Sequence, residues 1–204
     1  MLRECGAFVS VEQSIRAAHL RGGRRFYAQF RAPLELYALV RLTGAREIVE
    51  TGVSSGVSSA HFLLGLRRNR RGRLHSIDQP MVQRSTRLAP DESVVAVPPG
   101  ATSGWAVPAP LRRGWDLRIG RSERLLPRLV AELDRIDLFL HDSRHTPAHL
   151  RFELDTVRPK LRSGSIVLAD NTTTTGRAFE RFADRLGARV ARRGRSDLVG
   201  LRVP

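Results

Sequence analysis

Oxygen-bearing side chains close two apolar runs in the C-terminal half of the chain. Asp142 follows the run DLFLH, and Asp170 and Asn171 follow the run SIVLA. If these runs are neighbouring parallel strands, their carboxyl ends meet at one edge of a sheet, which is where open parallel sheets bind ligands. Carboxylate and amide oxygens suit a hard cation such as Mg²⁺. We therefore predict a metal site here; the alternative is that Asp142 caps a helix and that Asp170 and Asn171 form a turn.

An earlier apolar run, EIVET, is followed by a turn that contains Gly52 and Gly56. Glycines let a ligand approach the backbone closely, and a helix that follows offers free amide groups to a carboxylate or phosphate. Glu50 lies inside this run, where an unpaired carboxylate is costly to bury, so it needs a cationic or donor partner. Asp78 closes the next run, RLHSI, and a carboxylate there accepts the ribose hydroxyls of a nucleoside. Simple capping of a helix or turn by Asp78 is the alternative.

Three histidines, His141, His145 and His149, are spaced by four residues around the end of the DLFLH run. His145 is a candidate general base, because an imidazole with a pKa near ~6.5 suits proton transfer at neutral pH. Its alternative is a solvent-facing role ahead of the next helix. The three histidines with Asp142 also form a candidate zinc or iron site. We favour the oxygen-ligand site, because His141 precedes the strand end and His149 falls inside the predicted helix.

Alternating strands and helices must position these residues. A first helix is predicted at residues 11–19, before Gly22 and Gly23, and a second from Pro33 to a stop at Gly44. The strands predicted after it are EIVET, residues 74–78, WDLRIG, IDLFLHD and SIVLAD. The helices predicted between and after them are VSSAHFLLGLRR, SERLLPRLVAEL, one that starts after the Thr146 cap and ends at Gly164, and residues 177–186.

The end of the chain, ARVARRG and SDLVGLRVP, predicts a terminal strand pair that turns near Gly194. This pattern predicts an α/β fold with a mostly parallel sheet, helices on both faces and an antiparallel edge added last. Residues 79–114 interrupt the pattern with a segment longer than ordinary loops. It is either a lid over the acceptor, with Trp105 as a stacking surface, or a region of unrecognised elements, such as a strand at 94–97 and a buried Trp105.

Composition limits the class of protein. The chain has 204 residues, of which 41% are hydrophobic, and this fits one soluble globular domain. The net charge is +15, and Lys160 is the only lysine among 35 basic residues. Such a surplus attracts polyanions, so nucleic-acid binding stays an alternative. The densest run, residues 67–73, is however expected at the end of a helix, where the helix dipole favours cations.

Cysteine usage and hydropathy exclude further classes. Cys5 is the only cysteine, which excludes an internal disulfide and a paired-thiolate zinc site. No apolar run approaches the ~20 residues that span a bilayer, and the N-terminus lacks the charged-then-apolar order of a secretory signal. We expect a cytoplasmic protein with no membrane partner.

Several of these motifs resemble those of one family. The pattern E-x-G-x-x-x-G of Glu50, Gly52 and Gly56, with Ser58 after it, resembles the cofactor loop of class I S-adenosylmethionine (SAM)-dependent methyltransferases of the catechol O-methyltransferase branch. IGRSERLLPRL resembles the segment that contacts adenine there, FLHD and LADN resemble the two metal-ligand segments, and His145 lies where those enzymes carry the general base. The resemblance covers residues 33–204 and implies a Rossmann-like, doubly wound methyltransferase domain, preceded by an N-terminal helical segment, residues 1–32.

The resemblance also implies a role for each matching residue. The residues that contact SAM would be Glu50, Gly52, Ser54, Gly56, Ser58, Asp78, Ser122, Glu123, Asp142 and Ser143. Asp142, Asp170 and Asn171 would hold Mg²⁺ or another divalent cation, and His145 would take a proton from the acceptor. The sequence departs from the family pattern at Ser54, where a glycine is common, and at His145, where catechol enzymes use lysine.

The implied function is metal-assisted transfer of the SAM methyl group to a hydroxyl of a small molecule. Alternatives with the same cofactor are methylation of nitrogen or carbon, or another reaction of the sulfonium. A basic nucleic-acid-binding protein on the same fold is an alternative from another class. A nicotinamide dehydrogenase is disfavoured because it has no use for Asp142, Asp170 and Asn171 together. The sequence leaves the identity of the acceptor and the existence of a homodimer open.

Overall fold

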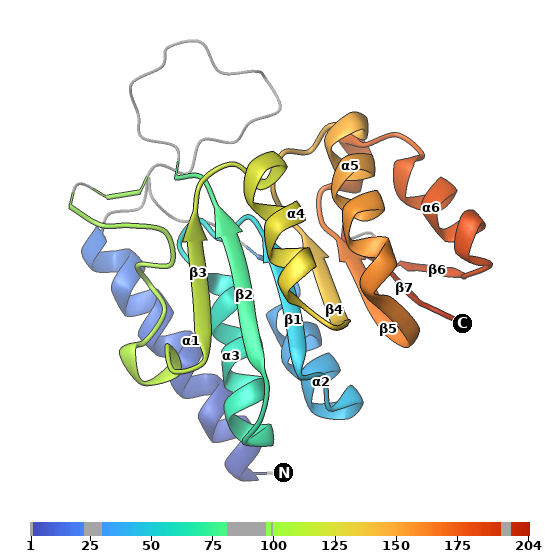
Figure 1. Ribbon diagram of the computed structural model, residues 1–204. Coiled ribbons are helices and arrows are strands. Elements are labelled where there is room, and N and C mark those ends of the chain that lie inside the picture. The colour runs from blue at the N-terminus through green and yellow to red at the C-terminus, as the bar shows by residue number, and fades with distance from the viewer. Residues whose placement is uncertain (1, 23–29, 81–96, 99, 193–196) are drawn as a thin grey trace.

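A twisted sheet forms the centre of the molecule (Figure 1). The computed structural model describes residues 2–22, 30–80, 97–98, 100–192 and 197–204. The strands in these residues are β1 (Glu47–Thr51), β2 (Arg73–Asp78), β3 (Trp115–Ile119), β4 (Ile136–His141), β5 (Leu161–Ala169), β6 (Val190–Arg192) and β7 (Val199–Arg202). Their order is β3-β2-β1-β4-β5-β7-β6; β1 to β5 pair in parallel, whereas β7 is antiparallel to β5 and to β6. The predicted fold class, mostly parallel with an antiparallel C-terminal strand, is confirmed.

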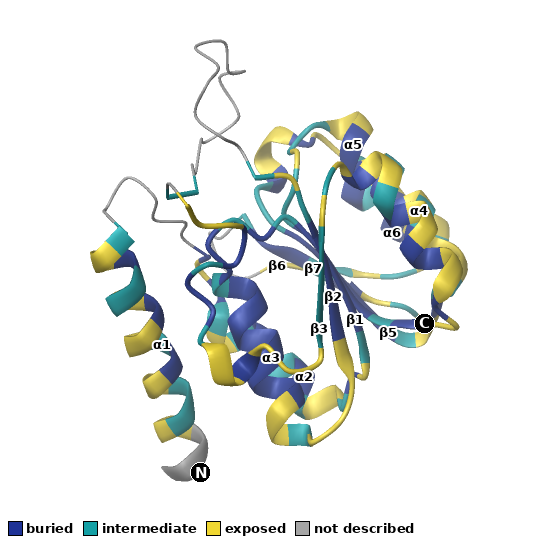
Figure 2. Ribbon diagram, turned by 60° about the vertical axis from the view of Figure 1, so that its left-hand side comes forward, coloured by how far each residue is buried: buried dark blue, intermediate teal, exposed yellow. Residues whose placement is uncertain are grey.

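Helices cover both faces of this sheet (Figures 1 and 2). One face carries α1 (Leu2–Gly22), α2 (Pro33–Thr43) and α3 (Val57–Asn69), and the other carries α4 (Ser122–Glu132), α5 (Pro147–Val157) and α6 (Ala178–Leu186). Successive residues of a strand point to opposite faces. Ile48 of β1 therefore packs into the apolar layer under α2 and α3, and its neighbour Val49 into the layer under α4 to α6. Burial of these two apolar layers holds the strand ends in place.

The helix ends follow the sequence signals. α2 begins at Pro33 and is closed by Gly44, which has a φ of 66° and whose N–H bonds to the carbonyl of Val40. α5 begins after Thr146, whose hydroxyl accepts a hydrogen bond from the N–H of His149 at 3.3 Å. The loop between β4 and α5, which carries predicted site residues, is therefore fixed at its far end by a helix cap.

Two elements differ from the sequence prediction. α1 spans Leu2–Gly22 instead of residues 11–19, because its first two turns contain no proline and a single glycine does not break a helix. The prediction that α5 continues to Gly164 is wrong: α5 ends at Val157, and β5 begins at Leu161 after a 3₁₀ turn that contains Pro159. A proline cannot continue the hydrogen-bond ladder of a helix, and this outweighs the helical spacing of Leu161.

Packing links the N-terminal helix to the sheet. Val11 and Ile15 of α1 are buried in the same apolar layer as residues of α2 and α3. Trp105 is partly buried beside α1, with its ring 5.2 Å from that of His19, so it packs at the edge of this layer. The boundary between residues 1–32 and 33–204 remains a prediction. No helix in the described ranges has the length and apolarity that crossing a membrane requires.

Parts of the long β2–β3 connection and of the terminal strand pair cannot be compared with the predictions. The predicted strand at 94–97 falls almost entirely outside the described residues, as do residues 81–96 and 99 of the predicted lid and the turn near Gly194. The described end of the connection contains a short 3₁₀ turn, Ala109–Leu111, before β3.

Candidate functional site

The residues predicted to act together follow one edge of the sheet. Thr51 of β1 is in register with Ile77 of β2 and with His141 of β4, and His141 is in register with Ala169 of β5. The next residue along each of these four strands therefore lies at the same position along the strand direction. These residues are Gly52, Asp78, Asp142 and Asp170. The carboxyl ends of these parallel strands lie at one edge of the sheet (Figure 1). The turn of residues 52–56, called the glycine loop below, and the three aspartates therefore follow the strands at the same edge.

The turn after β1 depends on glycine at two points. Gly52 has a φ of 85°, and a Cβ there would lie 1.8 Å from the carbonyl oxygen of Asp142. Gly56 has a φ of 94°, and a Cβ there would lie 2.4 Å from Cγ2 of Val107. Ser54, where the family commonly has glycine, adopts the same left-handed region with a φ of 49°. The backbone of this loop therefore lies directly against the segments that follow β4 and precede β3.

Asp78 is engaged by two groups inside the protein. Its Oδ1 accepts a hydrogen bond from the N–H of Val53 at 2.9 Å, and its Oδ2 accepts one from the hydroxyl of Ser103. The chain after Ser103 is tied to the glycine loop, because the N–H of Gly104 donates to the carbonyl of Ser54 at 2.7 Å. A ribose that binds Asp78 would share this carboxylate with Ser103 or replace its hydroxyl.

Glu50 is fully buried at the centre of the edge. Three hydroxyls donate to its carboxylate: Ser58, Ser59 at 2.6 Å and Ser76 at 2.8 Å. Burial raises the pKa of Glu50 to about 7, although the serine hydrogen bonds act in the opposite direction. The predicted requirement for a donor partner is thus met by serines, two of them on the first turn of α3.

We expect Glu50→Gln to remove a pH dependence of stability. Burial raises the pKa of Glu50 to about 7 in the folded protein, against an ordinary value of 4.5, so the folded state binds this proton more tightly than the unfolded state. Its contribution to stability is full below pH 4.5 and is lost as the pH rises to about 7, a loss of about 3 kcal/mol. Glutamine does not titrate. Urea unfolding at pH 5 and pH 8 with a chelator should therefore show a smaller drop in the free energy of unfolding in the variant.

The control for this measurement is Asp184→Asn, which removes the charge of an exposed carboxylate of α6. Its drop in stability between the two pH values should match that of the wild type. An equal drop in Glu50→Gln would contradict the raised pKa.

Asp142, Asp170, Asn171 and His145 form the other half of the edge. Nε2 of His145 is 3.1 Å from Nδ2 of Asn171 and 3.9 Å from Oδ1 of Asp142. Burial raises the pKa of the Asp142 carboxyl well above its ordinary value, and the charges of Asp170 and of two further carboxylates raise it more. Burial likewise raises the pKa of Asp170. The two acids therefore form a buried acidic group whose negative charge a bound cation would offset.

The alternative metal site of three histidines finds no support. Within the residues that the structure describes, no group of three or more His, Cys, Asp or Glu side chains is arranged to hold a metal ion. His141 and His149 instead both contact Glu153, through Nδ1 at 2.7 Å and Nε2 at 2.9 Å. The site of two carboxylates and one amide stays a prediction.

Ser122 and Glu123, predicted to contact adenine, lie at the start of α4, and Ser143, also predicted to contact SAM, lies after β4. Ser122 is buried, and its hydroxyl is 3.0 Å from Nε2 of His149. Glu123 is exposed, with Oε1 3.5 Å from Nδ1 of His149. The hydroxyl of Ser143 donates to Glu153 at 2.9 Å. The two serines thus approach the same histidine and glutamate pair from different elements.

Sequence reasoning missed four polar residues of this edge: Ser59, Ser76, Ser103 and Glu153. The serines gave no signal, because a single hydroxyl in a helix, strand or loop is common. Glu153 did give one: it lies between Leu150, Leu154 and Val157 on the apolar face of α5, where a carboxylate requires buried partners.

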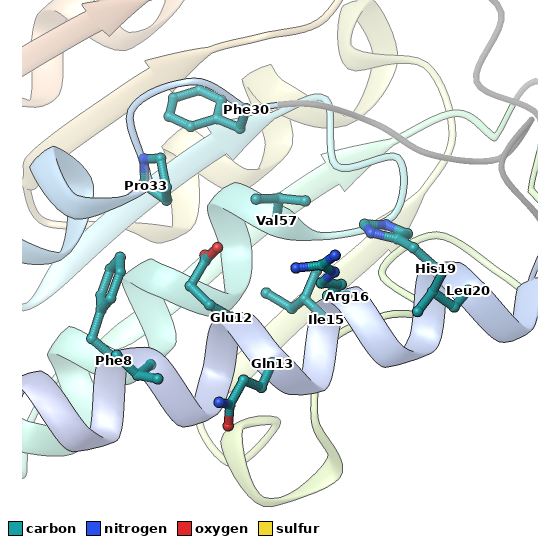
Figure 3. A pocket seen from close by; sticks show the side chains of 11 residues that line it. Phe8, Glu12, Gln13, Ile15, Arg16, His19, Leu20, Phe30, Pro33 and Val57 are labelled. Atoms are coloured by element: carbon teal, nitrogen blue, oxygen red, sulfur yellow. The ribbon is translucent and has the colours of Figure 1, made fainter.

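A cavity of about 680 Å³ lies between α1 and the starts of α2 and α3 (Figure 3). Its lining is mostly apolar and includes Phe8, Ile15, Phe30 and Val57. Val57 is the first residue of α3, directly after Gly56 of the glycine loop. The cavity therefore adjoins the glycine loop at the carboxyl ends of the strands, on the side of the N-terminal helix α1.

The densest arginine run lies away from this edge. α3 ends at Asn69, and the run continues into β2, which begins at Arg73, at the amino ends of the strands (Figure 1). Arg67 donates to the carbonyl of Pro110 at 3.0 Å, so part of the run has a structural partner. The position matches the predicted solvated helix end.

A family model described as a methyltransferase domain matches residues 49–172. The matched part begins in β1 and ends just after Asn171, so it contains the whole group of strand ends described above. A curated protein of Mycobacteroides abscessus, named "Putative O-methyltransferase", is 33% identical over 162 residues. These cover 78% of this chain and 66% of that protein, so the chain spans just under two thirds of the relative's length.

Solved structures resemble the whole fold. The O-methyltransferase TomG from Streptomyces achromogenes, involved in tomaymycin synthesis and solved in complex with SAM, matches with a TM-score of 0.66 and 20% identity, over 93% of this chain and 89% of that chain. An O-methyltransferase from Bacillus cereus in complex with S-adenosylhomocysteine (SAH) matches with a TM-score of 0.61 and 17% identity, over 97% of this chain and 90% of that chain. At such identities the likeness establishes the fold.

Proposed function

Because the chain belongs to the methyltransferase domain family, we propose that it transfers the methyl group of SAM to a hydroxyl oxygen of a small molecule, with the help of a divalent cation. The observation that carries the proposal is the register of β1, β2, β4 and β5, which brings a glycine loop and three aspartates to one edge. The curated relative and the two solved structures named above, described as O-methyltransferases, support oxygen as the acceptor atom.

SAM is proposed to lie along this edge in one orientation. Asp78 would accept the ribose hydroxyls, and the adenine would lie near Ser122, Glu123 and Ser143. The amino-acid end would meet the glycine loop, where free N–H groups at the start of α3 suit a carboxylate. Glu50 would act from beneath this loop through Ser58, because its own oxygens are buried.

The reaction is an in-line displacement at the methyl carbon. The acceptor oxygen forms a bond to this carbon, the bond between carbon and sulfur breaks, and SAH leaves as a neutral thioether. The proton of the acceptor hydroxyl goes to Nε2 of His145, the ring nitrogen that faces Asp142 and Asn171. Holding the two reactants in line supplies much of the rate, and the histidine base adds to it.

The donor set at the second half of the edge fits a divalent cation. Asp142, Asp170 and Asn171 offer oxygen ligands, which Mg²⁺ prefers. Burial, and after it the charge of neighbouring carboxylates, raises the pKa of both acids, and a bound cation would offset both effects. When bound, the cation would orient the acceptor hydroxyl and make it more acidic.

The acceptor is proposed to be a largely apolar small molecule that enters from the cavity beside α1 (Figure 3). Two observations support this entrance. Val57 lines the cavity and directly follows Gly56 of the glycine loop. Phe30, which also lines the cavity, precedes Arg31. The charge of Arg31 lowers the pKa of Asp170, so this wall of the cavity lies on the side of the proposed cation site. A cavity of about 680 Å³ has the size of small-molecule sites.

Calorimetric titration tests the cofactor and the cation together. SAM is titrated into the protein with and without Mg²⁺, and Mg²⁺ is then titrated into the SAM complex. We expect SAM to bind the wild type and Mg²⁺ to bind its complex. Asp170→Ala should still bind SAM, but its affinity for Mg²⁺ should fall at least about tenfold because it loses one ligand.

Asp184→Ala is the matched control, since it removes an exposed carboxylate of α6. It should behave as the wild type. An unchanged response to Mg²⁺ in Asp170→Ala would refute the cation site, and absence of SAM binding in the wild type would refute the function. Mass and proton spectra of the product from a panel of phenols and amines then separate transfer to oxygen from transfer to nitrogen or carbon.

A further inference from the structure

A carboxylate with no assigned role lies beneath the edge of the sheet where SAM is proposed to bind. Glu153 is fully buried on the inner face of α5, among Leu150, Leu154 and Val157. An unpaired charge in an apolar layer is strongly destabilising, so a buried carboxylate persists only where donors surround it. The identity of these donors indicates what the residue does.

Four donors converge on Glu153 from different elements. The hydroxyl of Thr51 is 2.6 Å away, Nδ1 of His141 2.7 Å, the hydroxyl of Ser143 2.9 Å and Nε2 of His149 2.9 Å. A carboxylate has about four acceptor positions, so this one is fully used. Although burial alone would raise the pKa of Glu153, the hydrogen bonds from His141 and His149 lower it well below its usual range. The group is therefore a fixed negative charge.

These donors belong to three segments of the proposed cofactor site. Thr51 is the last residue of β1, next to the glycine loop, and Ser143 lies in the loop after β4. His149 extends the network to the start of α4, because its Nε2 is also 3.0 Å from the hydroxyl of Ser122. One buried side chain thus connects the ends of β1 and β4 with the first residue of α4.

We propose that Glu153 is a positioning residue that holds Ser122 and Ser143 in the geometry that binds the adenosine part of SAM. The inference rests on the proposed function, because it needs SAM at this edge. Glu153 lies beneath the edge and acts through the side chains that it holds. Its loss should therefore weaken binding of the adenosine end and leave the transfer step itself largely intact.

The test uses Glu153→Gln, which keeps the shape of the side chain but replaces one acceptor oxygen with an NH₂ donor. Calorimetry measures binding of SAH and of 5′-methylthioadenosine, which keeps adenosine but lacks the amino-acid end. We expect both dissociation constants to rise at least about tenfold and by a similar factor. In turnover assays the KM for SAM should rise likewise, with kcat at saturating SAM changed about twofold or less.

Asp137→Asn is the matched control. Asp137 lies in β4 and, like Glu153, accepts hydrogen bonds; they come from the N–H groups of Arg46 and Glu47, at the opposite edge of the sheet. It should bind both ligands as the wild type does. Should Glu153→Gln fail to fold, two variants test the network while keeping the carboxylate. Thr51→Val breaks one link and His149→Gln breaks two, to Glu153 and to Ser122, and each should weaken binding of methylthioadenosine.

The outcomes separate the two proposals. A folded Glu153→Gln that binds both ligands with wild-type affinity overturns the positioning role, and so does a loss confined to SAH, which would place the defect at the amino-acid end. If Glu153→Gln does not fold and both link variants bind normally, the positioning role also fails. A wild type that binds neither ligand would instead refute the proposed function, and the positioning role with it.

Discussion

His145→Ala is expected to lower kcat by a factor of about 10² to 10⁴, the usual contribution of a general base. The reason is that Nε2 of His145 lies 3.9 Å from Oδ1 of Asp142 and 3.1 Å from Nδ2 of Asn171, beside the residues proposed to hold the cation that orients the acceptor oxygen. The side chain lies outside the glycine loop and the adenine segment. Affinity for SAM, measured by calorimetry, should therefore change little while initial rates of methyl transfer fall.

His75→Gln is the control for removing a histidine. His75 lies in β2 and pairs with Glu47 and Asp116 at 3.0 and 3.2 Å, away from the carboxyl ends of the strands. This substitution should affect thermal stability more than kcat. If folded His145→Ala binds SAM and keeps the wild-type kcat, the histidine is not the base. The cation alone would then have to make the acceptor hydroxyl acidic enough to react.

Gly52→Ala is expected to abolish SAM binding and to lower the free energy of unfolding by about 3 kcal/mol. Two costs add: a left-handed backbone costs a residue with a Cβ about 1 to 2 kcal/mol, and forcing an atom into a packed region costs about 1 to 3 kcal/mol. The atoms in the way are backbone, with the carbonyl oxygen of Asp142 1.8 Å from the added Cβ, so no rotamer change relieves the clash. The ends of β1 and β4 must move apart.

Gly187→Ala separates the two costs, because Gly187 has a φ of 66° but nothing within 4 Å of an added Cβ. It caps α6 and should lose only the conformational part, about 1 kcal/mol, with normal SAM binding. Urea unfolding and calorimetry on both variants provide the comparison. Equal losses of stability, or normal SAM binding in Gly52→Ala, would show that the β1 and β4 ends are not held together at this contact.

The sequence predicts the sheet and the strand ends well because these signals are local. Runs that end in an aspartate mark β2, β4 and β5, and a run that ends in a glycine turn marks β1. A parallel sheet then forces their carboxyl ends to one edge. The predicted end of α5 at Gly164 is wrong, because the helical spacing of Leu161 does not compensate for the helix-breaking effect of Pro159. Here a steric rule of the backbone outweighed a periodic pattern.

Partners of buried polar groups are harder to predict, because they are distant in sequence. Glu50 could be expected to need a donor, but that Ser76 of β2 supplies one follows only from the strand register. The contact of Ser103 with Asp78 has no local signal, since it depends on how the chain returns after β2. The contacts of Glu153 with Thr51 and Ser143 likewise arise only when α5 packs on the sheet.

The antiparallel pairing of β7 with β5 makes the end of the chain part of the structure next to Asp170. The carbonyl of Asp197 accepts hydrogen bonds from both the N–H and the hydroxyl of Thr172, at 3.4 and 2.8 Å. A protease that cut before Asp197 would remove this anchor and β7 together. The loop after β5 would then lose its support, so a trimmed protein would become inactive with every predicted site residue still present.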